Sequence, residues 1–389
     1  MKNNLIFVLG LGIVILLTNR WIEWNQAIEL VSAGDVSHAY EKIAKIAPAF
    51  LTESLPFHHT QRFFIHYVVG CVSKFFDLQL YSTYLGAVLA CITIVVLVFH
   101  FILKHLEVSN TIYRVCMGIL FFSPYTFRYY LLVPGMSADL VFILGVALLV
   151  LGLLKVFPIF IFLGMAVSLL GRPTLLLGLP VILSWTFLEP SWKYFNLKNK
   201  IILSFIFLLW CFVFLKFVNW FAVKISPGIF PEVKGYTIFS FFVSSEFNIV
   251  KLLIHYLRIF VPFLLLGFLF FRHFLKNKKN LLFWLHVFLG LSIVAQPFFT
   301  NPNTVIGNGA RLSTLGVVPI IVALGLFLRN ATKFSNKYYE VFFFIFLFLF
   351  SLHHLYSWLG PFSVNSFAIW YTLLAFCCAL TFKLRFRSN

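Results

Sequence analysis

Long apolar stretches separated by short polar links run along the whole chain. A bilayer core about 30 Å thick is crossed by roughly 20 apolar helical residues, and only helices or closed barrels satisfy backbone groups within lipid. The pattern therefore predicts an all-α polytopic transmembrane bundle of about 12 spans, within a range of roughly 11 to 13. The expected spans are 4–19, 80–103, 111–128, 138–155, 156–171, 173–188, 200–222, 248–271, 281–298, 312–328, 340–357 and 365–382.

Composition agrees with this pattern. Hydrophobic residues make up 61% of the chain and charged residues 11%, against roughly 25% charged in soluble domains. Neither internal repeats nor polar linkers divide the sequence, so we expect a single transmembrane domain over 1–389 without a separate soluble domain.

The distribution of basic residues predicts the sidedness. Segment 61–77 is apolar but short, and it carries four ionisable side chains, so it is not expected to cross. With a cytoplasmic N-terminus, 17 of the 30 Lys and Arg residues then fall in short cytoplasmic pieces, as the positive-inside rule requires. We therefore expect both termini in the cytoplasm, a retained signal anchor at 4–19, and a multi-pass protein of a bacterial inner or plasma membrane.

The largest outer piece is the loop 20–79, which is expected to contain two amphipathic interfacial helices, about 24–33 and 36–47. In the second helix, apolar and small residues recur at helical spacing on one side, opposite Glu41, Lys42 and Lys45. That spacing is typical of a helix lying on a membrane surface. The other outer pieces are 129–138, 171–173, 223–247 and 299–311.

The formal charge of +18 would suggest nucleic acid as a partner of a soluble protein. Here the positive-inside rule accounts for the position of the basic residues in short links between spans. Membrane lipids are therefore expected as partners, and nucleic acid is not. The chain contains no Walker loop, dinucleotide fingerprint, nucleophile elbow or zinc-ligand spacing. An ATP-driven pump is thereby excluded for the chain alone. No cofactor is predicted, and although a divalent metal is compatible with the acids, no ligand spacing supports a metal site.

Two acids on the predicted outer face are candidates for chemistry. Asp35 lies at the start of the second surface helix, and Asp139 at the start of the span 138–155. Each has a structural interpretation, because Asp is favoured at helix N-termini. Each also has a functional one, as a base or a charged group at the lipid–water boundary.

Two arginines are predicted at the same face. Arg172 lies between two spans with almost no loop, and Arg311 follows a glycine-containing segment at the start of a span. Either side chain could anchor the chain to lipid headgroups or hold a phosphate through its planar guanidinium. Arg62, His58 and His59 at the entry to segment 61–77 are further candidates for substrate or phosphate binding, although a histidine pair in a loop is more often polar filler.

The order of these motifs resembles the GT-C superfamily, the multi-spanning glycosyltransferases that use sugars linked to polyprenyl phosphate. The resemblance covers roughly residues 1–190, with Arg311 as a separate match. It is carried by Gly34-Asp35, Tyr40-Glu41-Lys42-Ile43-Ala44, Gln61-Arg62-Phe63-Phe64, Ser123-Pro124-Tyr125, Asp139, Gly171-Arg172-Pro173-Thr174 and Gly309-Ala310-Arg311. The first acidic site is a lone Asp where some members have paired acids, which puts metal dependence in doubt.

The resemblance implies a transferase that moves a sugar from the lipid-linked donor to a glycan, lipid or protein acceptor outside the cytoplasm. Asp35 would act as general base in an inverting displacement, Asp139 as a second catalytic acid, and Arg172 and Arg311 would hold the lipid phosphate. Two alternatives remain open: a transporter or flippase, and a polymerase of lipid-linked saccharides. Transporters concentrate ionisable groups near the bilayer midplane, whereas here the candidates share one face.

Overall fold

The computed structural model describes residues 2–30, 34–123, 125–227, 280–296 and 311–329, together with single positions between 341 and 351. Two predicted spans, 248–271 and 365–382, lie outside the described residues. The described elements are helices. They are α1 Lys2–Thr18, α2 Trp24–Leu30, α3 Gly34–Ile46, α4 Phe57–Thr60, α5 Phe63–Phe75, α6 Leu80–His105, α7 Asn110–Phe122, α8 Arg128–Leu132, α9 Ala138–Lys155, α10 Pro158–Gly171, α11 Leu175–Leu188, α12 Leu197–Ile225, α16 Leu281–Val294 and α18 Val317–Leu328.

Four helical segments of the described part are long and apolar enough to cross a membrane: α6, α9, α12 and Arg311–Leu328, which ends in α18. Each of these segments contains an apolar stretch of 18 residues. In α9 and Arg311–Leu328, 89% and 94% of this stretch is buried inside the bundle, against 33% in α6 and 22% in α12. The outward side chains of α12 are nevertheless large and apolar, as in Phe205 and Phe212. A centre of buried helices with an exposed apolar periphery is the arrangement expected of a bundle in lipid.

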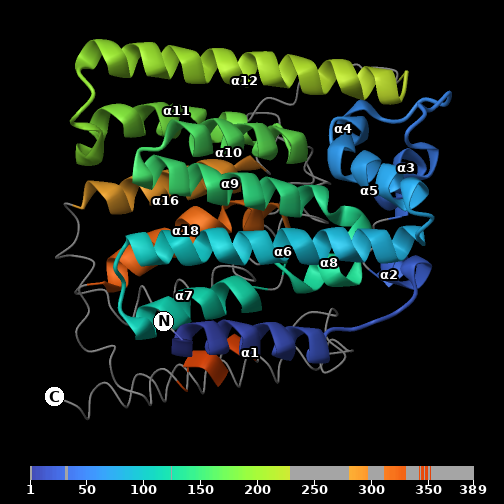
Figure 1. Ribbon diagram of the computed structural model, residues 1–389, viewed down its shortest axis with the longest axis horizontal. Coiled ribbons are helices and arrows are strands. Elements are labelled where there is room, and N and C mark those ends of the chain that lie inside the picture. Colours follow the sequence, from blue (N-terminus) through green and yellow to red (C-terminus); the bar gives the residue numbers. More distant parts are fainter. Residues whose placement is uncertain are drawn as a thin grey trace, which may run out of the picture.

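The helices run roughly along one direction, so the bundle has two distinct ends (Figure 1). At one end α1 finishes, α6 begins, and α3, α4 and α5 lie together; because Asp139 begins α9 here, we call it the Asp139 end. At the opposite end Asn4 of α1 bonds Asn110 of α7, and Arg329 beyond α18 pairs with Glu107 beyond α6. The links 104–114 and 193–200, predicted to be cytoplasmic, also lie at this opposite end.

Glycines set the distance between α9 and α10. Gly145 and Gly152 on α9, and Gly164 and Gly171 on α10, are each seven residues apart, which places each pair along one helix face. A Cβ on Gly171 would lie 2.5 Å from Phe142 N, and one on Gly152 would lie 2.7 Å from Ile161 N. Small residues that let two backbones approach this closely are typical of membrane helix pairs. The packing brings the first turn of α9 beside the last turn of α10.

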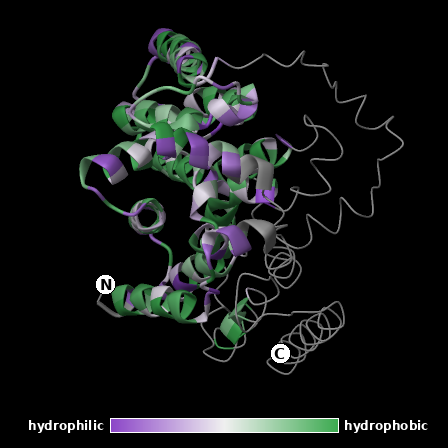
Figure 2. Cartoon of the chain, turned by 90° about the vertical axis from the view of Figure 1, so that its right-hand side faces the viewer, coloured by the Kyte–Doolittle hydropathy of each residue, from purple (hydrophilic) through white to green (hydrophobic). Residues whose placement is uncertain are grey.

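The amphipathic pattern in α3 agrees with its packing. Tyr40 and Ile43 on its apolar side are buried, whereas Lys42 and Lys45 on the other side are exposed. Viewed from the Asp139 end, hydrophilic residues lie among the elements facing the viewer, while α1 and α12 at the periphery are largely hydrophobic (Figure 2). The placement of α2 and α3 on a membrane surface, and a total of about 12 crossings, stay predictions.

The stretch 111–128 does not form one continuous helix as its hydrophobicity predicts. Helix α7 ends at Phe122, and Ser123 is extended with φ −61° and ψ 127°. The residue before a proline is pushed out of the helical region by the proline ring, and Pro124 follows Ser123. Arg128 then begins the separate helix α8 at the Asp139 end.

Candidate anion-binding site

Asp139 lies at the centre of a buried charged cluster. Its side chain projects from the first turn of α9, and its Oδ1 accepts a hydrogen bond from Nε of Arg172, the residue that ends α10. Both residues are only 1% exposed. The close glycine packing of α9 on α10 therefore joins two charges that are 33 residues apart in sequence.

A second arginine approaches the same carboxylate from another segment. Nε of Arg311 lies 3.4 Å from Oδ2 of Asp139, an ion pair without hydrogen-bond geometry. Nη1 of Arg311 donates to the Tyr129 hydroxyl at 3.2 Å, and its guanidinium carbon lies 5.9 Å from the centre of the Tyr129 ring. Tyr129 belongs to α8, so α8, α9 and the segment that leads into α18 meet at this cluster.

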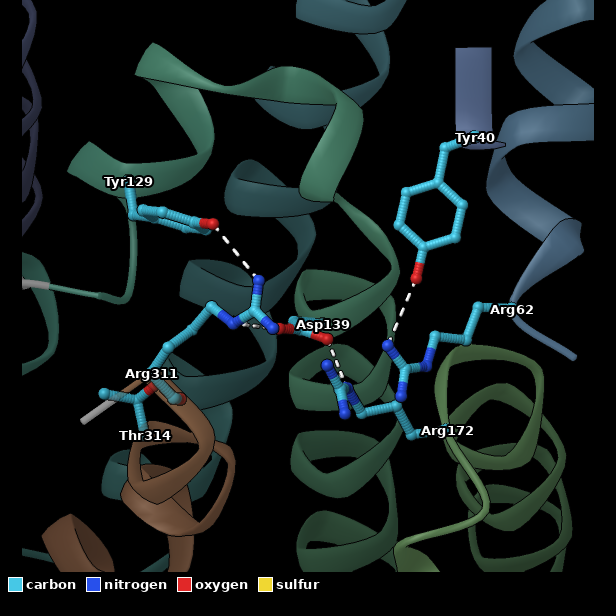
Figure 3. Close-up of polar contacts among 7 residues, drawn as sticks. All are labelled: Tyr40, Arg62, Tyr129, Asp139, Arg172, Arg311 and Thr314. Carbon is cyan, nitrogen blue, oxygen red and sulfur yellow. Dashed lines mark hydrogen bonds and ion pairs between the residues drawn. The ribbon is translucent and has the colours of Figure 1, made fainter. Parts of the chain in front are cut away.

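Arg62 provides a third guanidinium group. It lies between α4 and α5, its Nη1 donates to the Tyr40 hydroxyl at 3.2 Å, and its side chain points toward the Arg172–Asp139 pair (Figure 3). Electrostatic interactions of Arg62 with both Arg172 and Asp139 indicate that the three side chains share one site. In the described part, three guanidinium groups thus face one carboxylate, and the site carries an excess of positive charge.

Many of the polar atoms around Asp139 are donors without an acceptor. Nε of Arg62 and Nη2 of Arg172 are buried with no hydrogen-bond partner among the described residues, and so are the hydroxyls of Ser137 and Tyr130. Buried donors are nearly always paired in native proteins, and unpaired ones point to a missing ligand or water. Guanidinium and hydroxyl donors together suit the oxygens of an anion such as phosphate.

His58 and His59 lie beside these arginines on α4, with ring centres 4.0 Å apart. The His58 side chain is exposed on one side, but the groups packed around it and the nearby charges of Arg62 and Arg172 lower its pKa to about 4. Burial, His58 and Arg62 lower the pKa of His59 to about 3. Both imidazoles are therefore neutral near pH 7 and can donate or accept one hydrogen bond without adding charge.

The geometry removes the simplest structural interpretation for three of the predicted site residues. Asp139 does not cap α9, because its Oδ1 bonds Arg172 and its Oδ2 has no hydrogen-bond partner in the described part. Arg172 and Arg311 are 1% and 7% exposed, so the interpretation as headgroup anchors reaching into the interface is wrong for both. All three side chains turn inward toward one another (Figure 3).

Of the other predicted site residues, Arg62, His58 and His59 join the cluster and Asp35 is only partly placed. Asp35 lies in the first turn of α3, the helix that carries Tyr40, but its side chain falls outside the described residues. Tyr40 and Tyr129, which hold two of the arginines, are not predicted as site residues from the sequence, although Tyr40 begins one motif of the resemblance. Tyr129 opens the predicted outer piece 129–138, ten residues before Asp139, and this position is the signal that could have indicated it.

Nowhere in the described ranges do three His, Cys, Asp or Glu side chains lie close enough to hold a metal ion. Comparison of the chain with known protein families, with curated proteins and with solved structures finds no match. Its function is therefore inferred from the residues of the site.

Proposed function

We propose that the chain is a membrane glycosyltransferase of the GT-C type, which transfers a sugar from a polyprenyl-phosphate donor at the extracytoplasmic side. The observation that carries this proposal is the convergence of Arg62, Arg172 and Arg311 around Asp139 at one end of an apolar bundle. These arginines come from three distant segments and leave buried donors unpaired. A phosphate at the head of a lipid matches both the charge of the site and the apolar periphery of the bundle.

In the proposed reaction the acceptor hydroxyl oxygen attacks the anomeric carbon of the sugar. The bond from that carbon to the phosphate oxygen breaks, and its electron pair stays on the lipid phosphate. The hydroxyl proton passes to Asp35, the base that the resemblance suggests. The three guanidinium groups stabilise the charge that develops on the departing phosphate.

Within this proposal Asp139 holds the arginines in place. A carboxylate flanked by Arg172 and Arg311 is a poor base, because both guanidinium groups stabilise its ionised form. It fixes the direction of both side chains and offsets part of their mutual repulsion. Arg172 and Arg311 would thus be oriented before the donor arrives, which reduces the entropy lost on binding.

A transporter is disfavoured by the position of the charges. Transporters bind their substrates near the bilayer midplane on interrupted helices. Here Asp139 and Arg172 lie at the ends of α9 and α10, and the charges gather at one end of the bundle. A polymerase of lipid-linked saccharides would use the same arginines. The number of sugar units added to the acceptor therefore has to distinguish a polymerase from a transferase.

The test uses purified protein in nanodiscs and a panel of polyprenyl-phosphate sugars. The assay measures the release of polyprenyl phosphate, because transfer of any sugar to any acceptor releases this product. Asp35→Asn is expected to lower kcat by about 10²- to 10⁴-fold, the usual contribution of a general base. Arg172→Gln is expected to raise KM and lower kcat together, because a phosphate contact that strengthens in the transition state affects both.

Two matched controls remove a charge elsewhere. Asp77→Asn removes an exposed acid after α5, and Arg329→Gln removes a half-exposed arginine at the opposite end of the bundle. Neither is expected to change turnover. Unchanged turnover in both Asp35→Asn and Arg172→Gln, with active native protein, would contradict the assignment of the site. Products that carry more than one added sugar unit would indicate a polymerase in place of the proposed transferase.

A further inference from the structure

The ring of Tyr40 is held rigidly between two histidines. The imidazole of His66 stacks on it with ring centres 4.0 Å apart and an interplanar angle of 11°. The ring of His59 meets it edge-on at 5.9 Å. Tyr40 is 1% exposed and His66 is fully buried. Aromatic packing of this kind leaves the phenol ring few alternative rotamers.

His66 is itself fixed by a third aromatic residue. Its Nδ1 shares a hydrogen bond of 2.9 Å with the hydroxyl of Tyr84, which is also fully buried. The same hydroxyl lies 3.5 Å from the backbone oxygen of Tyr40. The contacts close a ring through α3, α5 and α6, because Tyr40 stacks on His66, His66 bonds Tyr84, and Tyr84 returns to the backbone of Tyr40.

Among the described residues, this closed network reaches the anion site through a polar contact of Tyr40. The Tyr40 hydroxyl accepts the hydrogen bond from Nη1 of Arg62, at 3.2 Å. No acid within the described ranges forms an ion pair with Arg62, and its Nε has no partner there. Arg172 is oriented by Asp139, and Arg311 by Asp139 together with the Tyr129 hydroxyl, whereas the partner of Arg62 in the described part is a phenol without a carboxylate beside it.

We infer that Tyr40 is the positioning residue of Arg62, and that His66 and Tyr84 hold the Tyr40 ring so that this guanidinium faces the phosphate of the lipid-linked substrate. The inference rests on the proposed function, because it assumes an anionic ligand. An arginine side chain has several rotatable bonds, and a ligand that must order it loses affinity. Tyr40 removes part of that cost before the ligand binds, while Nε of Arg62 stays free to donate to a phosphate oxygen.

The test measures binding of geranyl phosphate, a short isoprenoid phosphate, to the full chain in detergent. Tyr40→Phe keeps the stacked ring and removes the acceptor, and it is expected to weaken binding about tenfold, which corresponds to one hydrogen bond. Arg62→Gln is expected to weaken binding at least as much. If Tyr40 acts through Arg62, the double variant binds no more weakly than Arg62→Gln alone.

Tyr81→Phe provides the matched control, because Tyr81 on α6 packs edge-on against Trp24, which also contacts Tyr84, and the substitution keeps this ring packing while it removes a hydroxyl that is not one of the contacts of the ring Tyr40–His66–Tyr84. Tyr84→Phe provides a second variant: it frees His66, so a smaller loss is expected, and that loss should also vanish on the Arg62→Gln background. In a turnover assay with a polyprenyl-phosphate sugar, Tyr40→Phe should raise KM and lower kcat together, as Arg62→Gln does but by less, because Arg62 also faces the departing phosphate. A purely structural role would lower the amount of folded protein while KM and kcat of the folded fraction stay native.

Additive losses from Tyr40→Phe and Arg62→Gln would overturn the inference, since Tyr40 would then act on its own. Native affinity in Tyr40→Phe together with weak binding in Arg62→Gln would also overturn it, while the proposed function would stand. Native affinity in both variants would instead refute the proposed role of Arg62 in anion binding. Binding of geraniol, the alcohol that lacks the phosphate, should not differ between any of these variants.

Discussion

The packing of α9 on α10 makes a quantitative prediction at Gly171. A Cβ at this position would lie 2.5 Å from Phe142 N and 2.7 Å from Ala138 O, both backbone atoms. Ordinary carbon contacts need roughly 3.5 Å or more, so the two helices must separate by about 1 Å. Overpacking of this kind costs about 1–3 kcal/mol, against a gain of about 1 kcal/mol in helix propensity from Gly to Ala. Because Arg172 follows directly and Asp139 follows Ala138, the separation also opens their ion pair.

Two other glycines separate packing from function. A Cβ on Gly152 would lie 2.7 Å from Ile161 N, so Gly152→Ala should cost a similar amount of stability. Gly152 is about 20 Å along α9 from Asp139, by the helical rise per residue, so the site should keep its geometry. A Cβ on Gly86 meets nothing within 4 Å, and Gly86→Ala should therefore be neutral or slightly stabilising.

The assay is thermal unfolding in detergent combined with geranyl phosphate binding. We expect Gly171→Ala to lower both the melting temperature and the affinity, Gly152→Ala to lower the melting temperature alone, and Gly86→Ala to lower neither. If Gly171→Ala were as harmless as Gly86→Ala, α9 and α10 would not pack as described. If Gly152→Ala weakened binding as much as Gly171→Ala, the link between this packing and the site would be wrong.

Three further predictions concern the charges of the site. Asp139→Asn leaves the buried guanidinium groups of Arg172 and Arg311 without a counter-charge and should destabilise the protein by about 3–5 kcal/mol, with partial rescue of the melting temperature by geranyl phosphate. Tyr129→Phe removes the acceptor of Arg311 but keeps the ring, so a loss of about 1–2 kcal/mol in stability is expected, measured against the control Tyr81→Phe. The depressed pKa values of His58 and His59 mean that the unfolded chain binds more protons than the folded chain below about pH 6.5, so stability should fall as pH falls from about 6.5 toward 4. A bound phosphodiester would restore their proton affinity, so its stabilising effect should grow as pH falls, and this growth should shrink in His58→Gln.

Much of the candidate site could be predicted from the sequence because charge is scarce in this chain. Arg62, Arg172, Arg311 and Asp139 all lie at element boundaries, and the positive-inside rule assigns these boundaries to one face. Their placement together at the Asp139 end agrees with that reasoning. What the sequence could not provide is the pairing, since it depends on which helices become neighbours.

The residues that were missed have only weak sequence signals: Tyr40 stands in one motif of the resemblance and Tyr129 at the start of an outer piece, but neither position indicates a role at the site. Tyr40 and Tyr129 are two of 15 tyrosines in a chain where 20% of residues are aromatic. His66 counted in the sequence only as one of the four ionisable side chains that argue against a membrane crossing by 61–77. Two other structural features had a sequence signal from which no prediction was made. The seven-residue spacing of glycines in α9 and α10 indicates their close packing, and the proline at position 124 indicates the break between α7 and α8.

The charge balance leads to one last prediction, about Asp35. The described site has three guanidinium groups and one carboxylate, and each unpaired buried charge is costly. If Asp35 joins the site as the base, one excess positive charge remains, which the single charge of a donor phosphodiester neutralises. Proton transfer to Asp35 then removes one negative charge while the departing phosphate gains one, so the site stays neutral throughout the reaction.

The variant Asp35→Asn mimics the protonated base. It should lose turnover and yet bind the dianionic product, polyprenyl phosphate, several-fold to about tenfold more tightly than the native protein does. Removal of an acid far from the site would leave product affinity unchanged, as expected for the control Asp77→Asn. Weaker product binding in Asp35→Asn would show that Asp35 does not repel the product phosphate, and both the charge balance and the assignment of Asp35 as base would then be wrong.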